Sequence, residues 1–218
     1  GDPVVITRYL YKPDFAEGNS RFNDNKRTHL YTIEADGGAP AKQITQGDLY
    51  EHSPDWSPDG KEILYVSNRE PDSDQFFNYD LWAHSVVDAK TRRVTTTESA
   101  EYVPKWSPDG KRILFLGTRR GLTNLETTME DTHVWVINAD GSGRREAGKV
   151  IDNRQTSAGW SADGNWIYTT VQERGSVKLM RIPSRGGEAQ TVVGEAGQVG
   201  AWSVTKSGRL AYAFTSRR

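Results

Sequence analysis

The stretch Trp56-Ser57-Pro58-Asp59-Gly60 decides the fold, because it recurs along the chain. Residues 106–110 repeat it unchanged, and residues 160–164 repeat it with alanine in place of proline. A degraded fourth copy begins at Trp202 and ends at Gly208. The copies are roughly 50 residues apart, close to the ~40–45-residue period of a repeated four-stranded sheet. The apolar residues do not follow the i, i+3, i+4, i+7 pattern of a helical repeat, so the motif predicts repeated sheets.

Each copy of the motif predicts a tight turn between two strands. Proline presets φ at the second position of such a turn, aspartate suits the third, and glycine takes the positive φ that leaves it. Branched and aromatic runs follow each turn, and a third and a weaker fourth strand come after a variable loop. The second strands are assigned to residues 61–66, 111–116 and 165–170, the third to 80–83, 133–137 and 178–182, and one fourth strand to 92–95.

The predicted fold class is all-β, a β-propeller of four-stranded antiparallel blades, about four in number and incomplete at both ends. At the start, residues 4–11, 29–33 and 42–45 supply a second, a third and a fourth strand, and at the end Trp202 and residues 209–214 supply a first and a second. The single propeller domain 1–218 then divides into a partial blade 1–47, blades of about 48–97, 98–149 and 150–194, and a partial blade 195–218.

The composition excludes several classes of protein. With 28 basic and 29 acidic residues the net charge is −1, which argues against nucleic acids and membrane surfaces as partners. No apolar run approaches the ~18 residues of a transmembrane helix. The chain has 0 cysteines, so disulfides, thiolate zinc sites and cysteine nucleophiles are excluded. No targeting segment is visible, and for this soluble protein the compartment is left open, with the cytoplasm favoured over the periplasm.

No catalytic residue is assigned from the sequence. A serine hydrolase of the α/β type needs a Gly-x-Ser-x-Gly turn, and no such string occurs. The nearest string contains Ser161, which belongs to a predicted strand-to-strand turn. Ser203 begins a Ser-x-x-Lys string, which needs a helix to bring the lysine near the serine and instead falls where a strand meets a turn.

No metal or cofactor site is assigned either. The four histidines, His29, His52, His84 and His133, are far apart and lack the i, i+4 spacing of a helical metal pair. The acidic loop 70–80 lacks the glycine and the terminal glutamate of a calcium-binding EF-hand loop, and we interpret it as a solvated loop. Only His52, which precedes a first strand, is expected at the mouth of the propeller's channel.

The loops between second and third strands are the candidate recognition face. Residues 12–28, 69–79 and 117–132 are long, polar and dissimilar, while the turn motif repeats, and such loops emerge on one face of a propeller. Ordinary surface loops remain the alternative interpretation. The residues assigned to the recognition face are Arg69, Phe76, Phe77, Tyr79, Arg119, Arg120 and Glu130.

The repeats resemble those of a known family. The Trp-Ser-Pro-Asp-Gly units, with Ser67-Asn68-Arg69 after a second strand, resemble the propeller repeats of TolB and of prolyl-oligopeptidase-type serine peptidases. The opening residues 6–14 and 27–31 look like the propeller of acylaminoacyl-peptidase-like members. The resemblance implies a TolB-like propeller and, as a partner, an α/β-hydrolase catalytic domain that this sequence does not contain.

Two functions follow from the resemblance. In the first, the chain is the non-catalytic propeller region of such a peptidase, which covers the active site and restricts substrates to small peptides. In the second, it is a TolB-like module that binds a peptide or protein ligand without an enzymatic partner domain. Either closure of the ring within one chain or self-association through open blade edges is expected, with association favoured, because unpaired blade edges are normally covered in folded proteins.

Overall fold

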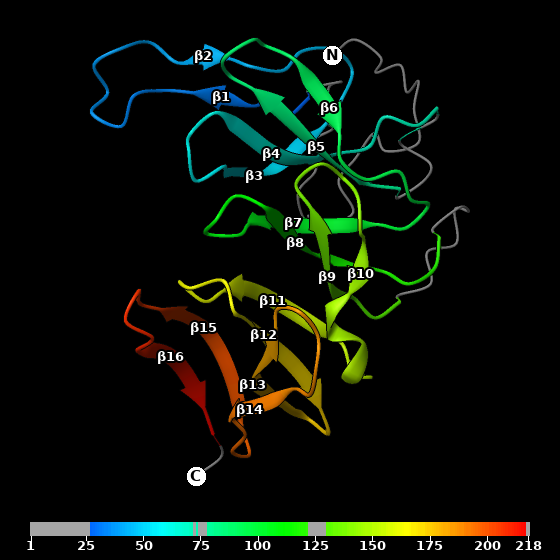
Figure 1. Ribbon diagram of the computed structural model, residues 1–218, viewed down its shortest axis with the longest axis vertical. Helices are drawn as coiled ribbons and strands as arrows, with labels where there is room; N and C mark the ends of the chain where they lie inside the picture. The colour runs from blue at the N-terminus through cyan, green and yellow to red at the C-terminus, as the bar shows by residue number, and fades with distance from the viewer. Residues whose placement is uncertain (1–26, 72, 74–77, 122–129, 217–218) are drawn as a thin grey trace, which may run out of the picture.

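The computed structural model describes residues 27–71, 73, 78–121 and 130–216. Short strands, arranged as small sheets, follow one another from the end that carries β1 to the end that carries β16 (Figure 1). Among the described residues, the helical segment is one 3₁₀ turn, η1 (Ala147–Val150). The all-β architecture of four-stranded antiparallel units that the sequence predicts is confirmed.

Three sets of four consecutive strands each pair in antiparallel order; two of them are separate sheets, and the third is extended by two more strands into a six-stranded sheet. We number the sets as sheets 2, 3 and 4. Sheet 2 consists of β3 (Glu51–Trp56), β4 (Glu62–Ser67), β5 (Asp80–Ser85) and β6 (Thr91–Arg93). Sheet 3 consists of β7 (Glu101–Trp106), β8 (Arg112–Gly117), β9 (His133–Asn138) and β10 (Arg145–Glu146). Sheet 4 consists of β11 (Gln155–Trp160), β12 (Trp166–Glu173), β13 (Ser176–Pro183) and β14 (Gln190–Val193).

Two smaller sheets flank these three. Sheet 1 pairs β1 (Tyr31–Thr32) with β2 (Lys42–Gln43), and the strand predicted for residues 4–11 lies outside the described residues. Sheet 5 pairs β15 (Gln198–Val204) with β16 (Leu210–Thr215). One parallel bridge, between Val177 and Gln198, joins sheet 5 to sheet 4.

The outer strands are shorter than the sequence predicts, because threonine hydroxyls replace part of the main-chain ladder. The Leu30 amide donates to Thr45 Oγ1 at 2.9 Å, at the edge of sheet 1. The Leu81 amide donates to Thr95 Oγ1 at 2.8 Å in the same way, in sheet 2. Each threonine thereby ends its strand and turns its side chain toward the next sheet.

The repeated motif forms the predicted turns. Gly60, Gly110 and Gly164 each have φ of +68°, which glycine adopts without a steric cost. Within the first turn, the Ser57 hydroxyl donates to Asp59 Oδ1 at 2.8 Å and accepts from the Glu62 amide at 2.9 Å. These hydrogen bonds hold the conformation of the turn, and they set the residue at which the second strand begins to pair.

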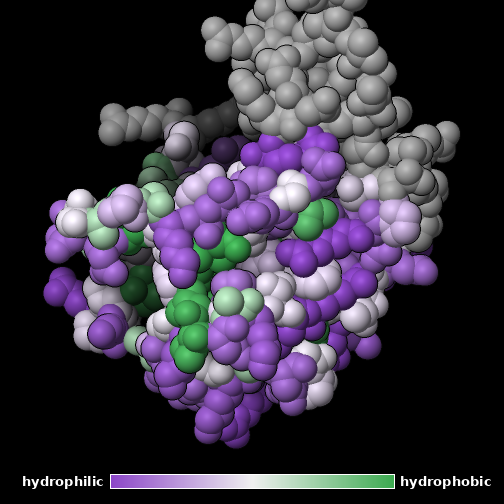
Figure 2. Space-filling model, turned by 90° about the horizontal axis from the view of Figure 1, so that it is seen from above, coloured by the Kyte–Doolittle hydropathy of each residue, from purple (hydrophilic) through white to green (hydrophobic). Residues whose placement is uncertain are grey.

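The motif tryptophans differ in burial, although their positions in the repeat are equivalent. Trp106 is 8% exposed, and Trp160 donates from Nε1 to the Lys105 carbonyl of the preceding inner strand at 3.1 Å. Trp56 is 49% exposed and lines a cavity of about 740 Å³ with Ile33 and Ile44. Within the described residues no inner strand precedes β3, so sheet 2 lacks this neighbour. From this end of the molecule, a hydrophobic strip crosses an otherwise polar surface (Figure 2).

The core lies between consecutive sheets, and the sheets are also linked by main-chain hydrogen bonds. Ile113, Leu114 and Phe115 of β8 are each 0% exposed, as expected for a strand covered on both faces. The first residues of β3, β7 and β11 each donate an amide hydrogen bond to a main-chain carbonyl in the segment that leads into the third strand of the preceding sheet. These bonds run from Glu51 to Thr28 at 2.9 Å, from Glu101 to Tyr79 at 3.1 Å, and from Gln155 to Thr132 at 2.8 Å.

Candidate recognition site

Three rings meet where these links place sheets 2 and 3 against each other. Tyr79, the last residue of a long loop, lies between His52 of β3 and Tyr102 of β7. Its ring centroid is 5.6 Å from that of His52, at an interplanar angle of 70°, and 6.0 Å from that of Tyr102. The first contact is edge-on and the second is tilted, and the edge-on arrangement is favourable for aromatic rings. We call these three residues the aromatic cluster.

The aromatic cluster is uncharged at neutral pH. Burial lowers the pKa of His52 from its ordinary value, so the imidazole is neutral. Burial, followed by the effect of Tyr50, raises the pKa of Tyr79. Burial, followed by the effect of Tyr79, raises the pKa of Tyr102 to about 12. The cluster therefore offers ring faces and hydroxyl groups, and it suits an uncharged ligand group better than a charged one.

A layer of buried acids lies directly behind the aromatic cluster. Strand alternation turns adjacent side chains to opposite sides, so Glu51 and Glu101 point away from His52 and Tyr102. Asp80 likewise follows Tyr79 in the chain. The residues Glu51, Asp80 and Glu101 are 1%, 1% and 0% exposed, and we call them the acid layer.

Two arginines lie beside acids of this layer and stack on tryptophans. The Arg69 guanidinium is 3.7 Å from Glu51 Oε1 and 4.1 Å from the centroid of the Trp82 ring. The Arg144 guanidinium is 3.9 Å from Glu101 Oε1 and 3.8 Å from the Trp135 ring centroid. Arg–Trp stacking of this kind combines cation–π attraction with apolar contact.

A glutamine takes the place of the glutamate in sheet 4. Gln155 is 0% exposed, and its Oε1 accepts from the Val134 amide at 2.8 Å. Its Nε2 donates to the carbonyls of Gly148 at 3.0 Å and Ile151 at 3.2 Å. Because η1 brings these carbonyls to this position, only a side chain with both a donor and an acceptor satisfies them.

The structure places the described recognition residues in four environments. Tyr79 belongs to the aromatic cluster, whereas Arg69 is held between Glu51 and Trp82. Arg119 donates from Nη2 to Glu146 at 2.8 Å. The Arg120 side chain is 90% exposed, and its amide donates to Glu130 Oε2 at 2.9 Å. Phe76 and Phe77 lie outside the described residues.

Sequence analysis missed Tyr102 and the acid layer. A signal for part of them exists, since Glu51, Glu101 and Gln155 each stand five residues before a motif tryptophan. Asp80 has no such signal, because its role depends on a neighbouring sheet. His52 was expected at the mouth of the channel, and the structure adds Tyr79, which contacts His52, and Tyr102, which contacts Tyr79.

The two serines considered as nucleophiles, Ser161 and Ser203, lie in a motif turn and in a strand. Ser161 donates to Asp163 Oδ1 at 2.5 Å and accepts from the Trp166 amide at 2.9 Å, as the motif serines of the other turns do. Ser203 lies in β15. Among the described residues, no three His, Asp or Glu side chains are grouped to hold a metal ion. The part of the chain that the structure describes also contains no helix of the length and hydrophobicity of a transmembrane span.

Solved structures similar to this chain include TolB proteins and peptidases. A putative TolB from Agrobacterium tumefaciens is 22% identical, with a TM-score of 0.58 over 75% of this chain. A puromycin-hydrolyzing peptidase from Mycobacterium tuberculosis is 16% identical, with a TM-score of 0.65 over 86%. The acylaminoacyl peptidase of Pyrococcus horikoshii is 17% identical, with a TM-score of 0.63 over 95%.

The chain spans 55% of the Agrobacterium protein and 32% of each of the two peptidases. These likenesses establish a shared fold. The comparison with curated protein sequences returned no match. A family model of the TolB β-propeller domain matches residues 10–134, which is more than half of the sequence. The chain therefore belongs to the TolB β-propeller domain family.

Proposed function

We propose that the chain is the non-catalytic propeller region of an acylaminoacyl-peptidase or prolyl-oligopeptidase-like serine peptidase. In this role it covers the active site of an α/β-hydrolase domain and restricts substrates to small peptides. The observation that carries the proposal is the aromatic cluster, which offers uncharged rings to peptide side chains at the end of a long loop. The extent of the likeness to the Pyrococcus peptidase, 95% of this chain, supports it.

The second candidate is a TolB-like module that binds protein partners and serves no enzyme. The family match and the putative TolB of Agrobacterium favour it. The coding sequence downstream of Arg218 discriminates the two. A reading frame that continues into Gly-x-Ser-x-Gly, followed by an aspartate and a histidine, supports the peptidase. A frame that continues into a different domain, or that stops, favours the TolB-like module.

The aromatic cluster is expected to bind short peptides with an aromatic side chain. Replacing Tyr79 by alanine should weaken binding about tenfold, because an aromatic contact contributes about 0.5–1.5 kcal/mol beyond its buried area. Fluorescence anisotropy with a fluorescein-labelled, N-acetylated Phe-containing tetrapeptide measures the effect. Tyr212→Ala is the matched control, since Tyr212 is 42% exposed on β16, away from the cluster. Equal loss in both variants would contradict the assignment.

The 218-residue chain is expected to release no product from acyl-peptide or ester substrates above the rate in buffer. The chemistry of serine hydrolases needs an activated nucleophile, and the chain has no Gly-x-Ser-x-Gly turn to present one. Chromogenic acyl-peptide assays test this directly. Turnover that an active-site serine reagent abolishes would show that a nucleophile was overlooked, and Ser161→Ala and Ser203→Ala would then locate it.

A further inference from the structure

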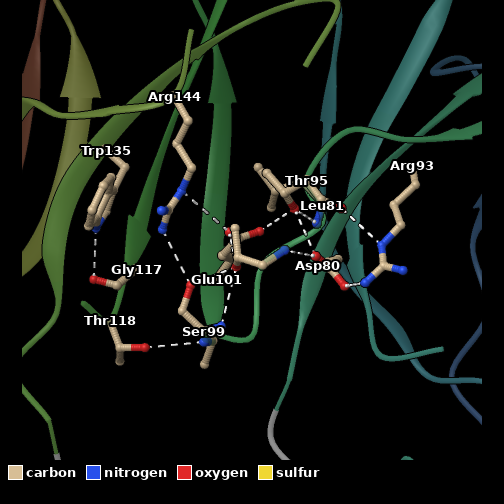
Figure 3. Close-up of polar contacts among 12 residues, drawn as sticks. Asp80, Leu81, Arg93, Thr95, Ser99, Glu101, Gly117, Thr118, Trp135 and Arg144 are labelled. Carbon is tan, nitrogen blue, oxygen red and sulfur yellow. Dashed lines mark hydrogen bonds and ion pairs between the residues drawn. The ribbon is translucent and has the colours of Figure 1, made fainter. Parts of the chain in front are cut away.

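Two carboxyl groups of the acid layer meet at one hydroxyl group. Thr95 Oγ1 is 3.2 Å from Asp80 Oδ1 and is hydrogen-bonded to Glu101 Oε2. The same oxygen accepts the Leu81 amide proton at 2.8 Å. Figure 3 shows this arrangement, with Arg93 and Arg144 on opposite sides of it.

The contacts of Thr95 require one additional proton. A hydroxyl group has one proton to donate and two lone pairs that accept. The Leu81 amide occupies one lone pair, and the hydroxyl proton can reach only one of the two carboxyl groups. The other carboxyl group makes a favourable contact with Thr95 Oγ1 only if it is itself protonated and donates. Asp80, Thr95 and Glu101 together therefore hold one proton more than two carboxylates would.

The partners of the two acids place that proton on Glu101. Arg93 Nη2 donates to Asp80 Oδ2 at 2.5 Å, which favours the ionised form of Asp80 against the burial that raises its pKa. Glu101 has no such direct cation, since Arg144 Nε is 3.9 Å from its Oε1. Burial, opposed by hydrogen bonds from Thr95 and Thr97, raises the pKa of Glu101 to about 7.

The charged groups around this pair come from four segments. Asp80 belongs to β5 and Arg93 to β6, and Arg144 precedes β10. The Glu70 carboxylate accepts a hydrogen bond from Arg93 at 2.7 Å. Burial lowers the pKa of Arg144, and the negative charge of Glu146 in β10 opposes this effect. Of these groups, only the Asp80 and Arg144 charges act directly on Glu101, with opposite signs.

We propose that Glu101 is a positioning residue for the aromatic cluster, and that its bound proton keeps Tyr79 and Tyr102 in contact across the boundary between sheets 2 and 3. Tyr79 and Tyr102 are the chain neighbours of Asp80 and Glu101, and the Glu101 amide donates to the Tyr79 carbonyl at 3.1 Å. Loss of the proton leaves two buried negative charges beside one hydroxyl group, and their repulsion separates the sheets at this link. Peptide binding, which rests on the proposed function, then weakens as pH rises through neutrality.

The sign of the stability change follows from the direction of the shift. The folded chain binds the Glu101 proton more tightly than the unfolded chain does, because the folded-state pKa is raised from 4.5 to about 7. The contribution of this proton to stability is therefore fully present below the unfolded value and is lost as pH rises through the folded value. The relevant window lies between about pH 4.5 and 7.

The experiment compares the 218-residue chain with Glu101→Gln. The glutamine amide donates to Thr95 Oγ1 and its oxygen accepts from Thr97, so it imitates protonated glutamic acid. Urea unfolding at pH 5 to 9 is expected to show a fall in wild-type stability relative to the variant across the window. Peptide affinity of the wild type should fall about tenfold from pH 6 to pH 8, following the protonated fraction of a group that titrates near 7, while that of the variant stays constant.

Glu51→Gln is the matched control, because Glu51 occupies the same position in sheet 2 and pairs with His29 at 3.0 Å and Arg69 at 3.7 Å. It should leave the difference between pH 6 and pH 8 in place. If Glu101→Gln fails to fold, infrared spectra of the wild type provide a second measurement. The C=O stretching band of a protonated, buried carboxyl group should be present at pH 6 and absent at pH 9.

The outcomes separate this proposal from the proposed function. The assignment of a bound proton to Glu101 is overturned by either of two results. One is that wild type and Glu101→Gln have parallel pH profiles of unfolding, and the other is that no protonated carboxyl band is present at pH 6. A bound proton together with pH-independent peptide affinity overturns the positioning role and leaves the peptide site intact. A bound proton in a chain that binds no peptide overturns the proposed function and with it the role assigned to Glu101.

Discussion

Replacing Trp106 by alanine is expected to lower the free energy of unfolding by about 3–5 kcal/mol, the range for a large buried aromatic residue. Trp106 is 8% exposed and packs in a hydrophobic cluster with Leu64, Val66 and Phe115. Its main-chain amide donates to Asp55 Oδ2 at 2.8 Å, and alanine keeps this hydrogen bond, so the expected loss comes from the side chain. The cavity left at this boundary weakens the contact between sheets 2 and 3.

The equivalent substitution Trp56→Ala is the internal control. Trp56 is 49% exposed, so its removal should cost less than about 1.5 kcal/mol, in proportion to the smaller area it buries. Urea midpoints of both variants, read with circular dichroism and with fluorescence, measure the difference. Equal losses would mean that Trp56 has a packing partner equivalent to that of Trp106.

Replacing Gln155 by glutamate is expected to destabilise the chain by about 3–5 kcal/mol at pH 8, the cost of an uncompensated buried charge. The new carboxylate would face the Gly148 and Ile151 carbonyls, to which Gln155 now donates. His133, 3.2 Å from Gln155 Nε2, is the cation that could compensate, but burial lowers its pKa. At pH 5 the loss should shrink, because a protonated glutamic acid can donate to one carbonyl.

Glu101→Gln is the reverse substitution at the equivalent position of the repeat, and its effect on stability is compared with that of Gln155→Glu. Glu101→Gln should be at least as stable as the wild type at pH 8, since it removes a buried charge beside Asp80. The two variants exchange the same pair of residue types at the same point of the repeat. Losses of similar size in both would show that the hydrogen-bond partners of these positions do not decide which residue is tolerated.

The sequence predicted the fold from local signals. The Ser-Pro-Asp-Gly turns and the second strands, such as residues 111–116, depend on residues that are close in the chain, and the structure confirms them. The exposure of Trp56 could not be predicted from its motif, because it depends on whether an inner strand of a preceding sheet packs against sheet 2, and the described residues supply none. The short outer strands were missed for a similar reason, since Thr45 and Thr95 bind main-chain amides that stand 15 and 14 positions away.

The candidate site was predicted only at Tyr79 and, as a channel residue, at His52. Arg69 was assigned to the recognition face because it opens a polar loop, yet its partners Trp82 and Glu51 come from other strands. Glu101 and Asp80 are 21 residues apart, so no spacing rule brings them together. Association through unpaired sheet edges, and the division into blades, stay predictions.

Each long loop between a second and a third strand begins and ends at two residues that pair with each other in the sheet. This pairing makes the repeat suitable as a scaffold for displaying inserted peptides. Ser67 pairs with Asp80, and Gly117 pairs with His133, so both long loops begin and end at fixed neighbouring positions. Doubling the length of a loop closed in this way costs only about 0.6 kcal/mol in chain entropy. Foreign peptide segments can therefore be inserted at one or both positions, and two different segments can be presented side by side on adjacent sheets.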